Sequence, residues 1–293
     1  MNKKVCERFK NVWTNFTYES SNKNYQIKND NDFKQYCSNQ NCVNELEKIS
    51  AGCLYLFNEF FKDSSVFNSV AKSNIDIVEY IIIWLSYMLN LKPPGSKSNL
   101  KHFYDTNINN DKYTKSIDNV EGCSNYKELI DKTNLMNMDI KDISKFYEVF
   151  KLLCEMYTEF DENTSDCAKY IAKSNDLFAK YEKLKIDSNI TNNNLGCKLL
   201  STLSNDYNNF KMKCKDSSSF PTIEKKQTSA QFSEDTSSSS SIVSKSVLFL
   251  SVLVAIAIFL GISYKYSLFG RRKRAQKQYL REKIKNIKKR MNH

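Results

Sequence analysis

An uninterrupted apolar stretch near the C-terminus constrains this chain more than any other feature. Residues 247–264 read VLFLSVLVAIAIFLGISY and include no charged side chain. As a helix, a stretch of this length spans roughly 27 Å, close to the hydrocarbon thickness of a bilayer. The sequence therefore predicts one transmembrane helix over 246–266, which separates a large N-terminal region from a short tail.

The tail carries nearly all of the net positive charge. Residues 271–293 contribute +10, from eleven Lys and Arg residues and one acid, to a chain total of +11. Clustered basic residues beside a span favour the cytoplasmic side, so we expect the tail 267–293 there and the N-terminal region in a lumen, a vacuole or outside. The near-neutral N-terminal region lacks the basic surface that nucleic-acid binding requires. The basic residues are Arg271, Arg272, Lys273, Arg274, Lys277, Arg281, Lys283, Lys285, Lys288, Lys289 and Arg290.

An apolar stripe runs along this basic tail. Leu280, Ile284, Ile287 and Met291 fall on one face of a helix, which predicts a short amphipathic segment. Such a helix suits the anionic inner leaflet of a membrane. A solvated stop-transfer tail, or docking onto an acidic cytoskeletal protein, fits the same residues, and the three alternatives stay open.

The cysteines all precede the predicted span. This distribution is typical of a region that faces an oxidising compartment and carries disulfides, with at least one cysteine left over because nine is odd. A small buried apolar role is the alternative for some of them, Cys154 in particular. The chain has no CxxC pair and only two histidines, so we expect no zinc site. The candidate disulfide cysteines are Cys6, Cys37, Cys42, Cys53, Cys123, Cys154, Cys167, Cys197 and Cys214.

The N-terminus shows no apolar run of the kind that a signal peptide requires. We therefore expect either that the late span itself serves as the targeting signal or that export uses another route. A tail-anchored protein would also lack a signal, but its anchor would end nearer the C-terminus than this span does.

Composition predicts an all-α N-terminal domain over 1–214. Six glycines and three prolines are too few turn residues for a sandwich or barrel of many short strands. Residues 52–61 read as one short apolar helix. The spacing of Ser73 and Asp76 predicts a capping box that opens a fully buried helix to about Leu91.

The second half of this domain predicts three amphipathic helices, because apolar residues recur at steps of three and four and form core stripes. Residues 92–124 between the halves are polar and predict a long surface connection, with 1–91 and 125–214 as candidate lobes. Residues 215–245 are serine-rich and predict a flexible linker. The stripe residues are Ile143, Phe146, Tyr147, Phe150, Cys154, Tyr157, Phe160, Cys167, Tyr170, Ile171, Ser174, Leu177, Phe178, Tyr181, Leu184, Leu200, Leu203, Tyr207, Phe210 and Cys214.

The motifs of common enzyme classes are missing from the sequence. It contains no phosphate loop, GxGxxG, HExxH or GxSxG, and His102 is the only internal histidine. We therefore expect a binding or display module without catalytic residues, cofactor or metal, and not an enzyme.

Three segments carry a family resemblance: GCLYLF at 52–57, YIIIWLSYML at 80–89, and the end of the chain, with KYSLFGRRKR at 265–274, QKQ at 276–278 and KKRMNH at 288–293. With them the chain resembles the PIR (Plasmodium interspersed repeat) variant antigens of malaria parasites, in a form with a short linker. The resemblance implies a non-enzymatic, exported protein of the infected erythrocyte surface or of parasite-derived vacuolar membranes, with a role in immune evasion and host-cell interaction.

Two hypotheses about function follow. In the first, the N-terminal domain is displayed and binds a host protein or cell, with contacts expected in 92–124 and 185–195, because binding residues concentrate on loops of a rigid scaffold. In the second, the protein is an internal membrane scaffold or trafficking protein that acts through its basic tail, and its cysteines are reduced core residues.

Overall fold

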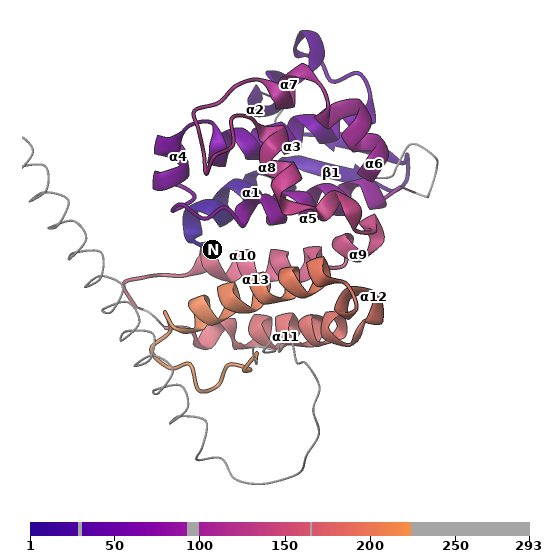
Figure 1. Ribbon diagram of the computed structural model, residues 1–293. Helices are drawn as coiled ribbons and strands as arrows, with labels where there is room; N and C mark the ends of the chain where they lie inside the picture. Colours follow the sequence, from indigo (N-terminus) through magenta and orange to yellow (C-terminus); the bar gives the residue numbers. More distant parts are fainter. Residues whose placement is uncertain (29–30, 93–99, 165, 224–293) are drawn as a thin grey trace, which may run out of the picture. The chain divides into compact units, whose positions relative to one another are not determined.

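The computed structural model describes residues 1–28, 31–92, 100–164 and 166–223. Met1–Gln227 forms one compact unit, which is helical apart from one two-stranded hairpin (Figure 1). The predicted cysteine-bearing helical domain is confirmed. The transmembrane helix 246–266, the basic tail and most of the linker lie outside the described residues. In the part of the chain that is described, no helix is long and apolar enough to cross a membrane.

The N-terminal half contains the hairpin and the two most apolar helices. Its elements are α1 Lys3–Asn15, β1 Phe16–Glu19, β2 Asn24–Ile27, α2 Asn31–Lys34, η1 Ser38–Gln40, α3 Glu45–Phe61, α4 Ser64–Ser69 and α5 Ile77–Asn90. The remaining elements are α6 Leu100–Phe103, η2 Tyr104–Ile108, α7 Asp111–Thr114, α8 Tyr126–Thr133, η3 Leu135–Asn137, α9 Ile140–Ser144, α10 Tyr147–Glu159, η4 Ala168–Tyr170, α11 Ile171–Ile186, α12 Ser188–Thr191 and α13 Asn194–Lys211.

Helix α1 joins the two halves of the domain. The side chain of Asn2 caps it by accepting a hydrogen bond from Val5 N, and its apolar face packs on α10. The rings of Phe9 and Phe150 meet edge to face at 4.8 Å between their centres. A disulfide between Cys6 and Cys154 also links the helices and is called here the α1–α10 disulfide. Helix α5 likewise packs on α9, so the segments 1–91 and 125–214 belong to one compact unit.

Helices α3 and α5 occupy the middle of the core. The predicted helix at 52–61 starts earlier, at Glu45, because Asn44 caps it with a side-chain bond to Glu47 N. The predicted buried helix is confirmed as α5, but it starts at Ile77 and the capping box is wrong. Ser73 lies in the left-handed region with φ of 56°, and Asp76 makes no side-chain cap bond.

The three predicted amphipathic helices form a layer of α10, α11 and α13 below the N-terminal helices (Figure 1). Their stripes meet at Phe210, whose ring lies 5.1 Å from that of Tyr157 and 5.6 Å from that of Tyr170. A disulfide between Cys167 and Cys214 ties the beginning of this layer to its end. The layer is thus held by packing and by a covalent link.

Two segments predicted to be exposed are in fact packed on the core. Within 92–124, the side chains of Phe103, Ile108 and Tyr113 are buried, so this segment is not only a surface connection. The first nine linker residues also fold back onto α13, where Phe220 and Ile223 are 3% and 2% exposed. The buried residues in these segments are too few to repeat at helical steps, so a search for helical periodicity does not find them. The hairpin is a third departure, because the sequence predicts an all-α domain.

Candidate functional site

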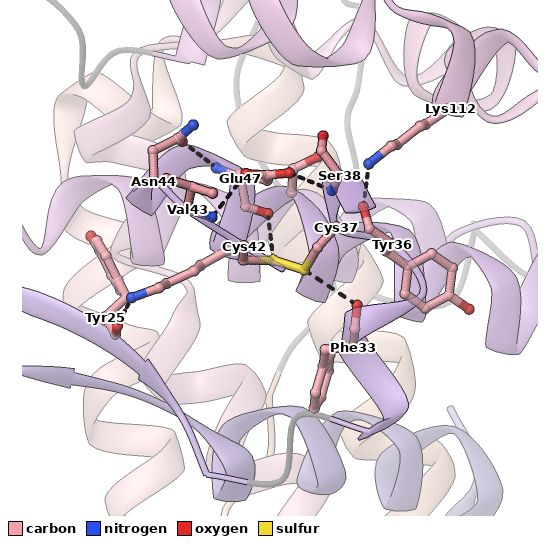
Figure 2. Close-up of a disulfide and its surroundings, with 12 residues drawn as sticks. Tyr25, Phe33, Tyr36, Cys37, Ser38, Cys42, Val43, Asn44, Glu47 and Lys112 are labelled. Atoms are coloured by element: carbon pink, nitrogen blue, oxygen red, sulfur yellow. Dashed lines mark hydrogen bonds between the residues drawn. A yellow bond between two sulfur atoms is a disulfide. The ribbon is translucent and has the colours of Figure 1, made fainter. Parts of the chain in front are cut away.

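A small disulfide-closed loop stands out on the surface beside the hairpin (Figure 2). Cys37 and Cys42, five positions apart, form this disulfide loop over residues 37–42. Asn39 and Gln40 at its tip have positive φ values of 52° and 57°, a conformation that residues with side chains rarely adopt. Residues 38–41 are exposed. The closed loop therefore presents a short set of uncharged polar side chains in a fixed conformation.

The carboxylate of Glu47 holds both ends of the disulfide loop. It accepts hydrogen bonds from Ser38 N at 2.5 Å and from Val43 N at 3.1 Å (Figure 2). The side chain of Asn44 in turn accepts a hydrogen bond from the backbone N–H of Glu47 and so caps α3. Partial burial alone would raise the pKa of Glu47, but these hydrogen bonds outweigh it and lower the pKa. Val43, at the second of these two ends, is 79% exposed.

Two hollows lie on either side of Tyr25, next to this loop. The first has a volume of about 620 Å³ and lies between β2 and the start of α3. An ion pair of Glu45 with Lys92 borders it, and the Tyr25 hydroxyl donates to Met88 O at 2.5 Å beneath it. Its lining residues are Tyr25, Asn44, Glu45, Leu46, Ile49, Leu89, Lys92, His102, Thr106 and Asn107.

The second hollow, called here the β2 groove, has a volume of about 450 Å³. It runs along all four residues of β2 and is closed on its far side by the disulfide loop. Among the residues that the structure describes, two lysines and no acidic residue line it. The lining residues are Asn24, Tyr25, Gln26, Ile27, Lys34, Cys37, Gln40, Asn41, Cys42 and Lys48. We call β2, the disulfide loop and the first turn of α3 together the hairpin face.

Six of the nine candidate cysteines form the three disulfides described above, so the prediction of disulfides is confirmed. Cys154 is therefore paired and is not merely a small apolar residue. The other three candidates, Cys53, Cys123 and Cys197, are free thiols. Cys53 is fully buried in α3, and burial raises its pKa to about 12, which keeps it protonated and unreactive.

The two segments predicted to contact a partner differ in how far their side chains are exposed. Within 185–195, Ile186 is 79% exposed, and the short helix α12 that follows is anchored by an ion pair of Lys145 with Asp187 at 2.7 Å. Within 92–124, Tyr113 anchors the segment through a hydrogen bond between its hydroxyl and that of Ser50 at 3.1 Å. The hairpin face was not predicted. The sequence did hold its signals, namely the closely spaced Cys37 and Cys42 and the residues Asn44 and Glu47, three positions apart.

Two buried tyrosines with raised pKa values belong to the core. Burial raises the pKa of Tyr80 and Tyr113 well above the ordinary range, so both stay protonated donors. Glu79 is 2% exposed and binds Lys198 Nζ at 2.6 Å and the hydroxyl of Thr202 at 2.9 Å. Among the residues whose structure is described, no three His, Cys, Asp or Glu side chains gather into a metal site. The eleven basic tail residues lie outside the described part.

Known proteins are similar to this chain in sequence and in fold. The family model described as "Plasmodium variant antigen protein Cir/Yir/Bir" matches residues 6–265. A solved structure entitled "Structure of a Plasmodium PIR protein ectodomain" is similar, with 30% sequence identity and a TM-score of 0.60. The similarity covers 78% of this chain and 98% of that chain. Among curated proteins, no match was found.

Proposed function

Because the chain belongs to the Plasmodium variant antigen family Cir/Yir/Bir, we propose that it acts as a non-enzymatic displayed antigen. In this proposal the described domain faces away from the cytoplasm, on the infected erythrocyte or on a parasite-derived membrane. It binds a host protein or a host cell, and changes among its exposed residues evade antibodies.

The three disulfides carry this proposal. Disulfides persist in oxidising surroundings and are rare where cells keep thiols reduced. The α1–α10 disulfide closes a separation of 148 residues, and the bond of Cys167 with Cys214 closes 47, so both constrain the whole domain. A covalently held domain suits display outside the cell. The apolar stretch and the basic tail support the same orientation by the distribution of charge.

The hairpin face is the contact surface that we favour. The disulfide and Glu47 hold its loop in one conformation, so a partner does not have to order it on binding. Binding residues are disproportionately found on loops that a rigid scaffold positions. The second segment that we favour for contacts is 185–195, where Ile186 is exposed. The absence of catalytic motifs from the sequence supports a binding role over a catalytic one.

An accessibility experiment tests the orientation. The Met1 amino group forms an ion pair with Asp206, so a tag at the N-terminus would disturb the fold. We therefore place the epitope tag in the exposed loop 161–164, between α10 and η4. Antibody labelling of intact infected erythrocytes is the expected result. A matched chain with the tag after residue 293 should label only after permeabilisation.

Labelling of the loop tag only after permeabilisation would contradict surface display and would favour the second hypothesis. In that case the protein acts as an internal membrane scaffold or trafficking protein through its basic tail, on anionic lipid or on the cytoskeleton. Deletion of 275–293 would then abolish function and leave the described domain folded. Disulfides found by mass spectrometry in the mature protein would argue against the reduced cysteines of this alternative.

A further inference from the structure

We propose that Cys42 is a site of thiol–disulfide exchange, at which a small thiol of the glutathione type opens the disulfide loop and leaves the domain folded. The proposal goes beyond the proposed function, because it assigns a chemical reaction to the loop. Only the effect on a partner rests on the hairpin face being the contact surface. Access to sulfur, loop length and backbone conformation distinguish this bond from the other two disulfides.

Cys42 is the least buried of the six bonded cysteines. Cys6 and Cys154 are both 0% exposed, and Cys167 and Cys214 are buried as well. Cys42 is half-buried, and the residues before and after it are exposed. It also lines the β2 groove, whose volume of about 450 Å³ suits a small thiol. Exchange requires that a thiolate reach a sulfur atom, so the bond at Cys42 is the most open to attack.

The exchange proceeds in two steps. The first thiol attacks as its thiolate and forms a new sulfur–sulfur bond with Cys42 Sγ. The bond between Cys37 and Cys42 breaks with its electron pair on Cys37 Sγ, which takes up the proton that the thiol lost. A second small thiol then attacks the added sulfur in the same way, and Cys42 leaves as a thiol. Two small thiols are thus oxidised to one small disulfide, and the loop disulfide is reduced to two thiols.

The structure accommodates the reduced form of the loop. Cys37 Sγ lies 3.6 Å from Phe33 O. Cys42 Sγ lies 3.8 Å from Glu47 O, so each new thiol has a backbone acceptor in place. The Glu47 carboxylate still holds both ends of the loop, which keeps the two sulfur atoms close enough to bond again. Because the disulfide closes only five residues, its loss releases little chain entropy, and the opening is local and reversible.

Opening the bond changes the tip of the loop. Asn39 and Gln40 have φ values of 52° and 57°, a left-handed conformation that residues with side chains rarely adopt. The closed loop imposes it, together with a hydrogen bond from Asn41 N to Ser38 O at 3.0 Å. In the reduced form both residues relax to ordinary φ values, and this hydrogen bond is lost. A partner that recognises the closed tip therefore binds in an oxidising compartment and is released in a thiol-rich one.

Differential alkylation tests the order of reduction. The free thiols of the full-length protein in detergent are blocked with iodoacetamide, and the protein is then exposed to reduced glutathione at neutral pH. New thiols are labelled with N-ethylmaleimide and assigned by mass spectrometry. We expect Cys37 and Cys42 to be labelled at least about tenfold faster than the other four bonded cysteines, with unchanged circular dichroism. Earlier or simultaneous opening of another disulfide, or loss of helix, would overturn the proposal.

Two matched variants identify the attacked sulfur. Cys37→Ser leaves the half-buried Cys42 as a free thiol, and Cys42→Ser leaves the buried Cys37. With oxidised glutathione, Cys37→Ser should acquire the glutathione adduct at least about tenfold faster than Cys42→Ser, because the reaction depends on access to sulfur. Equal rates, or faster modification of Cys42→Ser, would show that Cys42 is not the site of attack.

Hydrogen exchange with mass spectrometry tests the change at the tip. On reduction the Asn41 amide should lose its protection, while the amides of Ser38 and Val43 keep theirs through Glu47. Loss of protection at all three amides, or at none, would contradict a local opening. Reduction by thioredoxin but not by glutathione would overturn the assignment to a small thiol. Cell-surface labelling reports separately on the proposed function.

Discussion

Replacing Gly52 by alanine tests the packing of α3 on α5 most directly. A Cβ atom at this position would lie 2.6 Å from Cη2 and 3.2 Å from Cζ2 of Trp84, and 3.5 Å from the ring of Phe16. Ordinary contacts begin at 3.4 Å, so the indole must move by about 0.8 Å. Trp84 is fully buried and packs edge to face on Phe16, so it has little room to move. Gly52 is thus required by the close approach of the two helices.

The change in the free energy of unfolding caused by Gly52→Ala is the difference between two opposing effects. Overpacking a filled core costs about 1–3 kcal/mol, and this site lies near the upper end because both neighbours are buried aromatic rings. Alanine regains about 1 kcal/mol of helix propensity over glycine. We therefore expect Gly52→Ala to lower the free energy of unfolding by about 1–2 kcal/mol. The value is measured by guanidinium unfolding, followed by circular dichroism with the disulfides intact.

A double-mutant cycle identifies the cause. Trp84→Phe removes the ring atoms that the new methyl group would meet, and the indole Nε1 makes no hydrogen bond that this change would break. In the Trp84→Phe background, Gly52→Ala should be neutral or stabilising by up to about 1 kcal/mol. If the two substitutions instead add, with the full cost of Gly52→Ala retained, the contact with Trp84 does not explain the glycine.

Three further predictions concern the disulfides and two carboxylates. Alanine at both cysteines of the α1–α10 disulfide should lower the free energy of unfolding by about 5 kcal/mol, because this bond closes 148 residues. Alanine at both cysteines of the disulfide loop should lower it by only about 2 kcal/mol, because that bond closes five residues. Denaturant titrations of the two variants check this order. Glu47→Gln should cost about 1 kcal/mol at pH 7. The pKa of Glu47 in the folded protein lies below 4.5, the value in the unfolded chain. The stability that Glu47 adds relative to glutamine is therefore fully present above pH 4.5 and is lost as the pH falls through the folded pKa. Free energies of unfolding of both proteins, measured from pH 7 to pH 3, check this. Lys198→Ala leaves the buried carboxylate of Glu79 without its cation, so it should lower the free energy of unfolding by about 2–3 kcal/mol at pH 7. The control variant Lys183→Ala should leave the free energy of unfolding almost unchanged at the same pH. Burial raises the folded pKa of Glu79, so the deficit of Lys198→Ala should grow as the pH rises above 4.5, and a deficit that is constant with pH would refute this reasoning.

The long helices were predictable because their burial is periodic. Phe150, Cys154 and Tyr157 on α10, and Leu203, Tyr207 and Phe210 on α13, recur at steps of three and four and are all buried. Such a stripe stabilises one helix face wherever the partner lies. Local sequence therefore suffices to predict these helices, and the resemblance at 52–57 and 80–89 falls on α3 and α5, the core pair.

The hairpin and the packed segments were not predictable in this way. Strands β1 and β2 have four residues each, too short for an alternating pattern to stand out. Tyr113 and Phe220 are single aromatic residues within polar stretches, and each is buried because a partner from a distant element, Ser50 or Phe210, meets it. Disulfide partners depend on the same distant contacts, so the cysteine count predicted bonds but no pairing.

The disulfides also allow exposed residues of this domain to change without loss of the fold. The α1–α10 disulfide and the bond of Cys167 with Cys214 join elements in the core, away from the tip of the disulfide loop. Substitutions at exposed positions without special contacts usually change stability by at most about 0.5 kcal/mol. The covalent links contribute several times that amount each. Residues 38–41 and Val43 can therefore vary in chemistry, provided that Glu47 still holds both ends of the loop.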